Sequence, residues 1–455
     1  MQRLVSRALD RWLTGVARKP LILKGARQVG KTWLVRDLAQ RSSRRLVEVN
    51  FERDPGLAKH FRWREPGRVL DELGVVLGLR ISPERDLLFL DEVQGAREVL
   101  PTLRWFAEEL PSLAIVAAGS LLDFVLKEHA FSMPVGRVSY CTVGPMTFPE
   151  FLDAHGEELL HSRLAAWLPR LEWSPAAHER AREWFARYLM VGGMPAVVAA
   201  DVAGAEAEDV RRVQRDILTS YRDDFAKYTG RMGPRVLDQV LVAVVASLGQ
   251  KLVYTRLGEG VKNHQAKRAI ELLEDARLCR IIRYSSASGL PLAAHGKDTF
   301  RKAVLLDVGL LHPIVRTPAG QRFLAWSTLS AQARGQLVEQ AAAQQLAATA
   351  DDPCEEMPLY YWQREGGRPG EVDLVVQLGQ RIVPVELKAG AAGAMKSLHQ
   401  FMVDKQLNLA VRFDSNAASL QDLDVKTTQG ERAQYRLLSL PHHLAWRLPA
   451  IVASL

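Results

Sequence analysis

The stretch Leu21-Ile22-Leu23-Lys24-Gly25-Ala26-Arg27-Gln28-Val29-Gly30-Lys31-Thr32 decides the fold. Its apolar start predicts a buried strand, which breaks at Gly25, and a helix is expected to open near Gly30. In this strand–turn–helix setting, the spacing G-x-x-x-x-G-K-T predicts a phosphate-binding loop. Backbone N–H groups of the loop are expected to face phosphate oxygens, with Lys31 at the β- and γ-phosphates of ATP and Thr32 on Mg²⁺. The expected nucleotide-binding residues are therefore Gly25, Ala26, Arg27, Gln28, Val29, Gly30, Lys31 and Thr32.

The length and composition of the chain limit the number of domains, the kind of partner and the cellular compartment that can be expected. A chain of 455 residues is long enough for about two to four domains, each with its own core. The net charge of +8 permits a polyanionic partner without showing one. Three isolated cysteines, Cys141, Cys279 and Cys354, are expected to be unpaired, which is typical of a reducing compartment. Because no apolar run approaches the ~20 residues that span a bilayer, we expect no membrane insertion and a cytoplasmic location.

A second apolar run, Asp86–Leu90, leads into Asp91 and Glu92. This pattern predicts a buried parallel strand whose C-terminal end carries functional carboxylates. Asp91 is expected to hold Mg²⁺, and Glu92 to be the base that polarises the attacking water. Taken alone, the same pattern fits a core strand that ends in a solvated acidic turn, but its place after a phosphate loop favours the nucleotide site.

Two further positions are candidates for the hydrolytic site. Ser120 follows a third apolar strand, where it is expected to sense the γ-phosphate, to cap a helix over residues 121–127, or to do both. Arg137 is a candidate arginine finger that acts on a neighbouring subunit of a homo-oligomer. The alternative for Arg137 is an ordinary surface salt bridge.

These motifs, together with the run Pro145-Met146-Thr147-Phe148-Pro149-Glu150-Phe151-Leu152, resemble one widespread prokaryotic group. It is the AAA-type ATPase family with a C-terminal domain of unknown function numbered 4143, and the resemblance runs nearly end to end. The resemblance implies an AAA+ nucleotide-hydrolysis module, here placed at residues 1–150. The alternation of strands and helices independently favours a parallel sheet covered on both faces.

The middle of the chain reads as a helical lid over residues 151–245, followed by a winged-helix-like domain over 246–295. Within the lid, Glu208–Tyr228 predicts a long charged helix with a solvated face. The resemblance also implies the winged helix, whose second helix suits contacts with DNA phosphates and base edges; the alternative is a helix that only packs against protein. Its candidate DNA contacts are Lys262, Asn263, His264, Lys267 and Arg268.

The tail, residues 296–455, contains a predicted hairpin with Asp373 on one strand and Glu386 and Lys388 on the other. Residues two apart share a strand face, so Glu386 and Lys388 point the same way, and Asp373 can lie alongside them. With Glu339 on a preceding helix, the set resembles the PD-(D/E)xK nucleases, which implies Asp373 and Glu386 as metal ligands and Lys388 next to the attacking water. A Glu-Val-Asp sequence stands where Pro-Asp is common in those enzymes, so an active nuclease and an inactive binding domain both stay open.

The sequence therefore predicts an α/β protein. It comprises a P-loop AAA+ parallel sheet with a helical lid, a winged-helix middle domain and a small nuclease-like α/β domain. The predicted function is Mg²⁺-dependent ATP hydrolysis coupled to a C-terminal half that binds DNA, with cleavage of that DNA left open. The alternative is a nucleotide-switched module for binding nucleic acid or protein, with an inactive nuclease-like domain. A small-molecule kinase fits less well, because the chain carries long extra domains.

Overall fold

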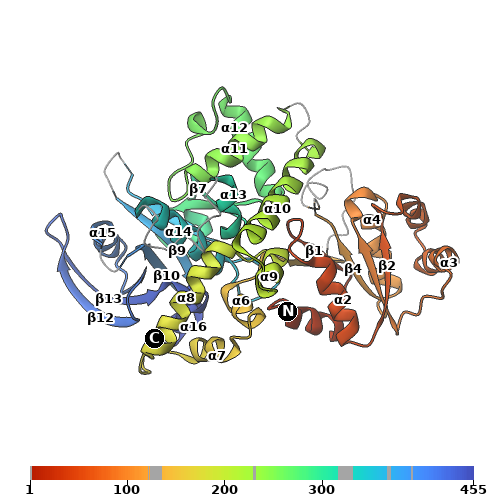
Figure 1. Ribbon diagram of the computed structural model, residues 1–455, viewed down its shortest axis with the longest axis horizontal. Helices are drawn as coiled ribbons and strands as arrows, with labels where there is room; N and C mark the ends of the chain where they lie inside the picture. The colour runs from red at the N-terminus through yellow and green to blue at the C-terminus, as the bar shows by residue number, and fades with distance from the viewer. Residues whose placement is uncertain are drawn as a thin grey trace.

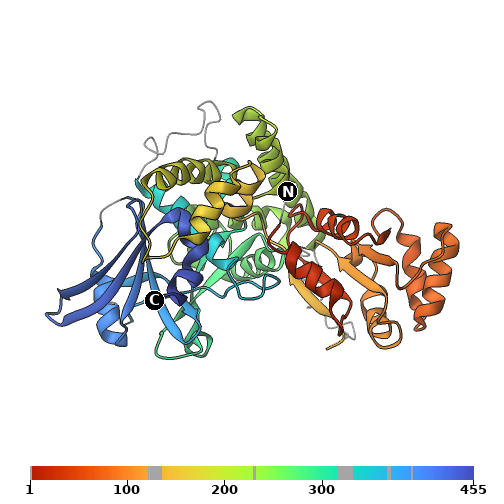
Figure 2. The same cartoon turned by 90° about the horizontal axis from the view of Figure 1, so that it is seen from below.

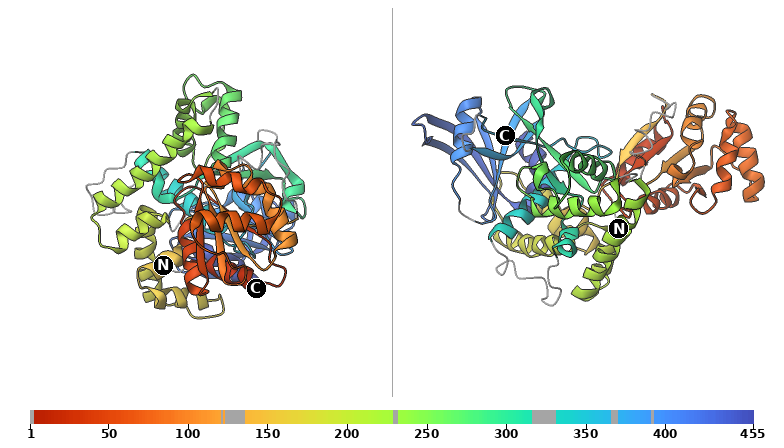
Figure 3. Two further views of the ribbon diagram at one scale, coloured as in Figure 1. Left: turned by 90° about the vertical axis from the view of Figure 1, so that its right-hand side faces the viewer. Right: turned by 90° about the horizontal axis from the view of Figure 1, so that it is seen from above.

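The computed structural model describes residues 3–120, 122, 136–228, 232–315, 331–365, 370–390 and 393–455. The helix predicted over residues 121–127 lies outside these ranges apart from Leu122. Figure 1 shows an N-terminal sheet at one end of the molecule and a C-terminal sheet at the other, with the helices α8 to α13 between them. The same order is seen from below (Figure 2) and from above (Figure 3, right).

The N-terminal sheet has five parallel strands in the order β2-β3-β4-β1-β5, which confirms the predicted parallel α/β fold. Its strand β3 is buried along its whole length. Leu87 and Phe89 pack into the core on one face of the sheet, and Leu88 and Leu90 into the core on the other, as expected for a strand covered on both sides. The elements are α1 (Ser6–Thr14), β1 (Leu21–Lys24), α2 (Lys31–Arg41), β2 (Arg45–Asn50), α3 (Pro66–Leu77), β3 (Asp86–Asp91), α4 (Val99–Glu109), β4 (Ala114–Ala118) and β5 (Ser139–Thr142).

Helices form the centre of the molecule. The short helix α6 opens with a capping box, in which Glu150 accepts hydrogen bonds from the backbone and the hydroxyl of Thr147. The same carboxylate pairs with the buried Arg3, so this helix is tied to the N-terminus of the chain. The helices are α6 (Phe148–Ala154), α7 (Glu158–Ala166), α8 (Pro175–Val191), α9 (Pro195–Val202), α10 (Ala207–Tyr228), α11 (Pro234–Ala246) and α12 (Asn263–Asp275).

The C-terminal sheet has eight strands in the order β12-β13-β11-β10-β9-β8-β6-β7. The β6–β7 hairpin follows α11 and α12, as a wing follows its helices, but it also forms one end of this large sheet. One sheet thus spans the boundary between the predicted winged-helix and tail domains at residues 295 and 296. The remaining elements are β6 (Cys279–Ser285), β7 (Gly296–Leu305), α13 (Leu311–Ile314), α14 (Ala331–Ala347), β8 (Tyr360–Gln363), β9 (Glu371–Leu378), β10 (Arg381–Leu387), α15 (Lys396–Lys405), β11 (Leu409–Asp414), β12 (Ser419–Lys426), β13 (Arg432–Pro441) and α16 (Leu448–Ala453).

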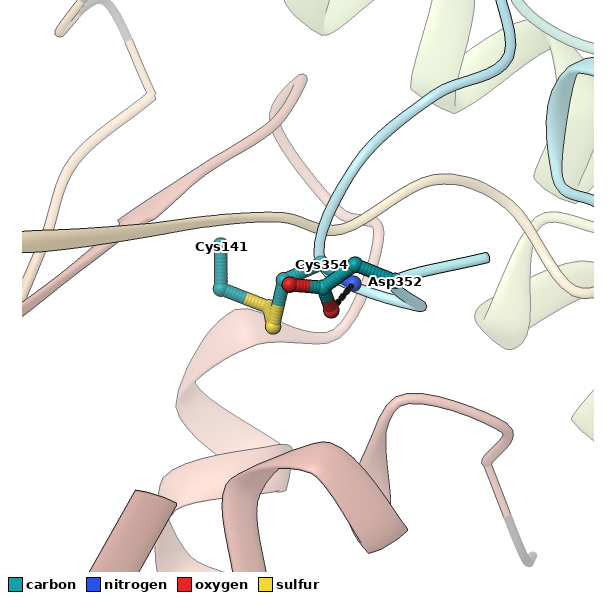
Figure 4. The surroundings of a disulfide bond; sticks show 3 residues. All are labelled: Cys141, Asp352 and Cys354. Atoms are coloured by element: carbon teal, nitrogen blue, oxygen red, sulfur yellow. Dashed lines mark hydrogen bonds between the residues drawn. A yellow bond between two sulfur atoms is a disulfide. The ribbon is translucent and has the colours of Figure 1, made fainter. Parts of the chain in front are cut away.

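The expectation of three unpaired cysteines is wrong, because Cys141 and Cys354 form a disulfide (Figure 4). They are 213 residues apart in sequence, and spacing alone gave no sign that they meet. The chain brings them together where the Thr142 N–H donates to the Cys354 carbonyl at 2.8 Å. Cys279 is buried with a free thiol. The bridge therefore joins the N-terminal sheet to the segment that leads into β8.

Candidate nucleotide site and carboxylate cluster

The loop between β1 and α2 has the backbone conformation that the phosphate-loop pattern requires. Gly25 has φ 145° and Gly30 has φ 93°, a region that side chains with a Cβ rarely adopt. At Gly25 an added Cβ would also lie 2.3 Å from the Val143 carbonyl oxygen. Gln28, at φ 66°, holds a left-handed conformation without being glycine. Such strained residues cluster at functional sites, which fits a loop shaped to wrap a ligand.

Lys31 lies across the loop that precedes it. Its Nζ donates to the carbonyl oxygens of Gly25 at 2.9 Å and Ala26 at 2.8 Å. Burial lowers the pKa of Lys31 to about 8, although the neighbouring Glu92 and Asp91 oppose the shift. Among the described residues no carboxylate contacts this buried ammonium directly, so it is ready to gain an anionic partner, and phosphate oxygens would supply one.

Thr32 and Asp91 meet at the same edge of the sheet. The Thr32 hydroxyl donates to Asp91 Oδ2 at 3.1 Å, although 59 residues separate them. Burial, and secondly the charge of Glu92, raise the pKa of Asp91. A hydroxyl and a destabilised carboxylate side by side are oxygen ligands of the kind that Mg²⁺ takes, so these residues fit the predicted metal.

Glu92 and Ser120 follow the ends of neighbouring strands beside the loop. Glu92 has φ 53°, and one of its oxygens accepts a hydrogen bond from Gln94 Nε2. The buried Ser120 Oγ and Gln94 Oε1 have no hydrogen-bond partner among the described residues. Gly119 lets Gln94 approach closely, since a Cβ there would lie 2.2 Å from its Oε1. Unsatisfied polar atoms next to a carboxylate indicate a place for a polar ligand or an ordered water.

Arg137 lies away from this edge. It precedes β5, whose first residue Ser139 pairs with Leu21 at the start of β1, so it sits at the opposite end of the strands from the loop. Its Nε donates to Glu108 Oε1 at 2.8 Å, and its side chain is 52% exposed. Within its own chain Arg137 therefore forms a surface salt bridge with Glu108, which was the alternative to an arginine finger. Its action as an arginine finger on a neighbouring subunit stays a prediction.

Helix α10 contacts the phosphate loop, which the sequence analysis missed. The Tyr221 hydroxyl donates to the Arg27 carbonyl at 2.7 Å, and Gln28 Nε2 donates to Ser220 Oγ at 2.8 Å. Arg27 Nε also lies 3.4 Å from Asp224 Oδ2, a carboxylate that is buried. The expected solvated face comprised Arg222, Asp223, Asp224 and Lys227. The expectation is wrong for Asp224, which is buried beside the loop, whereas Asp223 and Lys227 are exposed. The available signal was its apolar stripe, Ile217, Leu218, Tyr221 and Phe225, at helical spacing.

A buried polar cluster connects this region to the C-terminal half. Asp307 accepts hydrogen bonds from the Gly193 N–H at 2.7 Å and from Gln344 Nε2 at 2.8 Å. The Gly193 carbonyl in turn accepts from Met146 N at 2.6 Å. Burial raises the pKa of Asp307 to about 6, although these hydrogen bonds stabilise the charged carboxylate and so act to lower the pKa. The turn at Gly192 and Gly193, between α8 and α9, therefore joins the N-terminal domain to α14 through this carboxylate.

The candidate DNA contacts lie at the start of α12 and are all exposed: Lys262, Asn263, His264, Lys267 and Arg268. The opposite face of the helix, including Ala266, Ile270 and Leu273, is buried. Arg268 pairs weakly with Glu271 at 3.3 Å on the surface. The helix therefore presents a polar and basic surface that is not used for packing.

The predicted hairpin of the tail is present, and it brings Asp373 next to Glu386. Val385 of β10 pairs with Leu374 of β9, and Asp373 Oδ2 accepts a hydrogen bond from Leu387 N at 2.7 Å. Lys388 Nζ lies 2.6 Å from Glu386 Oε1, while the buried Glu386 Oε2 has no hydrogen-bond partner in the part of the chain that the structure describes. An unpartnered buried carboxylate oxygen fits a cation at this position.

Glu339 lies with a lysine that the sequence analysis did not single out. Lys302 Nζ is 3.2 Å from Glu339 Oε1 and 2.5 Å from Glu371 Oε1, and its side chain is only 1% exposed. Burial disfavours the ammonium, but the carboxylates outweigh it and the pKa of Lys302 is raised. Burial also raises the pKa of Glu339 and that of Glu386 to about 7. Within the described ranges, no three acidic, histidine or cysteine side chains come together closely enough to hold a metal ion.

The loop, the parallel sheet and the carboxylates at its edge define the N-terminal domain as a P-loop nucleotide-binding domain. Residues 17–152 match the family model described as "AAA domain", residues 334–427 match "Domain of unknown function (DUF4143)", and residues 182–320 match "Domain of unknown function (DUF8612)". The chain therefore carries an AAA domain in its N-terminal part and a DUF4143 region in its C-terminal half, as the resemblance implied.

Solved structures with a similar arrangement are distant from this chain. The ORC2 protein of Aeropyrum pernix, in ADPNP and ADP complexes, is 13% identical over 69% of this chain and 91% of that one, with a TM-score of 0.34. DnaA from Aquifex aeolicus, bound to AMPPCP, is 15% identical over 60% and 88%, with a TM-score of 0.27. PCH-2 of C. elegans is 15% identical over 38% and 47%, with a TM-score of 0.21. No curated protein sequence matches the chain. Among the helices of the described ranges, none has the length and apolarity to cross a membrane.

Proposed function

We propose that the protein is a Mg²⁺-dependent ATPase whose nucleotide state controls a DNA-binding C-terminal half. The observation that carries the proposal is the contact of α10 with the phosphate loop through Tyr221, Ser220 and Asp224. Tyr221, Ser220 and Asp224 contact Arg27 and Gln28 of the loop. Phosphate binding would therefore move the loop atoms that these residues of α10 contact. Since α10 also packs against α11 and α13, a shift of the loop would be passed to the helices that lead into the C-terminal sheet.

In the proposed hydrolysis, the ammonium of Lys31 leaves the loop carbonyls and binds the β- and γ-phosphates. Glu92 orients the attacking water and accepts its proton, and Ser120 holds the γ-phosphate or that water through its unsatisfied hydroxyl. Thr32 and Asp91 would hold Mg²⁺, which supplies charge neutralisation at the phosphates when it is bound. Arg137 would act on the nucleotide of a neighbouring subunit, which makes a homo-oligomer part of the proposal.

The proposed DNA surface is the exposed start of α12. Lys267 and Arg268 offer cationic groups to phosphates, and Asn263 can hydrogen-bond base edges. The net charge of +8 favours a polyanionic partner. The double variant Lys267→Glu with Arg268→Glu should weaken the salt-sensitive binding of DNA in a mobility-shift assay. An unchanged affinity would mean that α12 only packs against protein and does not contact DNA.

DNA cleavage by Glu339, Asp373, Glu386 and Lys388 is the second candidate function. Its support is the hairpin geometry together with the unpartnered Glu386 Oε2. A binding domain with an inactive carboxylate cluster is the alternative. Asp373→Ala should stop Mg²⁺-dependent nicking and leave ATP hydrolysis intact; if the wild-type protein cuts no DNA or RNA form with any divalent metal, the binding alternative stands.

The test of the proposed ATPase uses the full chain with Lys31→Ala. Removal of the ammonium should abolish hydrolysis, because the γ-phosphate loses its charge stabilisation. Retained turnover in the purified variant would contradict the proposal. Arg137→Ala should also lose activity and regain it when mixed with a Glu92→Gln chain, whereas a lack of rescue would favour the surface salt bridge.

A cytoplasmic location also belongs to the proposal. The disulfide makes this testable, since the cytosol keeps most thiols reduced. Alkylation of Cys354 in intact cells would fit the cytoplasm, and protection of that thiol would favour an oxidising compartment.

A further inference from the structure

We infer that Lys302 is a built-in cation that stands in for a divalent metal ion between Glu339 and Glu371. In this arrangement Glu339 is the partner of a lysine and is not a metal ligand. The inference concerns the cluster for which cleavage was proposed above, and it can fail while the ATPase and the DNA switch stand.

The first support is where Lys302 lies. Lys302 is on β7, the last strand at one end of the sheet, and pairs with Ile282 of β6. Its side chain nevertheless points inward, and its Nζ lies 5.3 Å from the ring centre of Tyr361 on β8. Only 1% of the side chain is exposed, whereas Lys297 on the same strand is 49% exposed in its pair with Glu365. A fully buried lysine is rare in proteins unless carboxylates compensate its charge.

The second support is the set of carboxylates around the ammonium. Glu339 and Glu371 lie 3.2 and 2.5 Å from Nζ, and Asp373 interacts electrostatically with the same group. Glu339 is 12% exposed and Glu371 is 34% exposed, so burial penalises the charge of Glu339 most, and a nearby cation is needed to keep these neighbouring carboxylates charged together. In a metal site that cation is the divalent ion, and here the chain supplies an ammonium in its place.

The third support is how Glu339 is enclosed. Its Oε1 faces Lys302, and its Oε2 lies against the backbone at Gly249, where an added Cβ would be 2.7 Å away. Gly249 itself has φ 76°, so the chain turns sharply there to cover the carboxylate. A divalent ion could reach Glu339 only if the ammonium left, whereas Glu386, across the hairpin from Asp373, keeps one buried oxygen without a partner among the described residues.

The experiment measures Mn²⁺ binding to the full chain without nucleotide, by titration calorimetry and by the shift of the thermal unfolding midpoint. Lys302→Met removes the charge at similar length. We expect it to lower the unfolding midpoint and to raise the Mn²⁺ affinity by on the order of tenfold over wild type. This gain should disappear in Lys302→Met with Glu339→Gln. Lys297→Met is the matched control on the same strand and should behave as wild type.

If Lys302→Met does not fold, a variant that keeps Lys302 still tests the inference. Glu339→Gln alone should leave wild-type Mn²⁺ affinity unchanged, because Glu339 is not a ligand while Lys302 is present. A loss of Mn²⁺ affinity on the order of tenfold in Glu339→Gln would overturn the inference. So would a Lys302→Met protein that folds and responds to Mn²⁺ no more than wild type.

Discussion

Replacing Tyr221 by Phe removes one hydroxyl and leaves the ring in place. That hydroxyl donates to the Arg27 carbonyl at 2.7 Å, and Tyr221 is only 3% exposed. A neutral hydrogen bond of this kind contributes about 1 kcal/mol. If it transmits the state of the phosphate loop to α10, its loss should reduce the coupling between nucleotide and DNA by about fivefold.

The assay compares the DNA dissociation constant with and without a non-hydrolysable ATP analogue, in wild type and Tyr221→Phe. The ratio of the two constants should be smaller in the variant. Tyr435→Phe is the matched control, because its hydroxyl and His399 Nδ1 form a 2.8 Å hydrogen bond in the C-terminal sheet, away from the loop. An unchanged ratio in Tyr221→Phe, or an equal reduction in Tyr435→Phe, would refute the role of α10.

Three further predictions test separate features. Burial lowers the pKa of Lys31 to about 8, and phosphate should raise it again; calorimetry at that pH should therefore detect uptake of about half a proton on nucleotide binding, and no uptake would contradict the lysine's role. The pKa of Asp307 is raised to about 6 in the folded protein, so its contribution to stability is present in acid and is lost as the pH rises through 6, by up to about 3 kcal/mol. In Asp307→Asn the free energy of unfolding should no longer fall as the pH rises toward 6. If its slope against pH stayed as in the wild type, the raised pKa of Asp307 would be contradicted. Cys141→Ser should cost about 2–4 kcal/mol more in the absence of reductant than in its presence, because reductant already opens the bridge in the wild type; an equal loss under both conditions would mean that the disulfide is absent.

Much of the nucleotide site could be predicted from the sequence, because its signals are local. The glycine spacing of the loop and the apolar strand before Asp91 each sit within a few residues of the groups they position. The parallel sheet then brings Thr32 to Asp91 without further information, since parallel strands end at one edge.

The parts that the sequence did not reveal depend on long-range contacts. Lys302 looks like an ordinary strand lysine until β7 and α14 bring Glu339 to it. Cys141 and Cys354 meet only because two distant segments pair. The charge pattern of α10 concealed Tyr221 and Asp224, since a helix with many charges can still bury a stripe against a loop. In each case the partner is set by tertiary packing and not by neighbouring residues.

The most direct test of the account is the affinity of the full chain for duplex DNA, measured at one salt concentration with the ATP analogue, with ADP and without nucleotide. The account predicts that the analogue and ADP give dissociation constants about tenfold apart, and that Lys31→Ala removes the difference. Equal affinities in all three states, in a protein shown to bind the nucleotide, would contradict control of the C-terminal half by the phosphate loop.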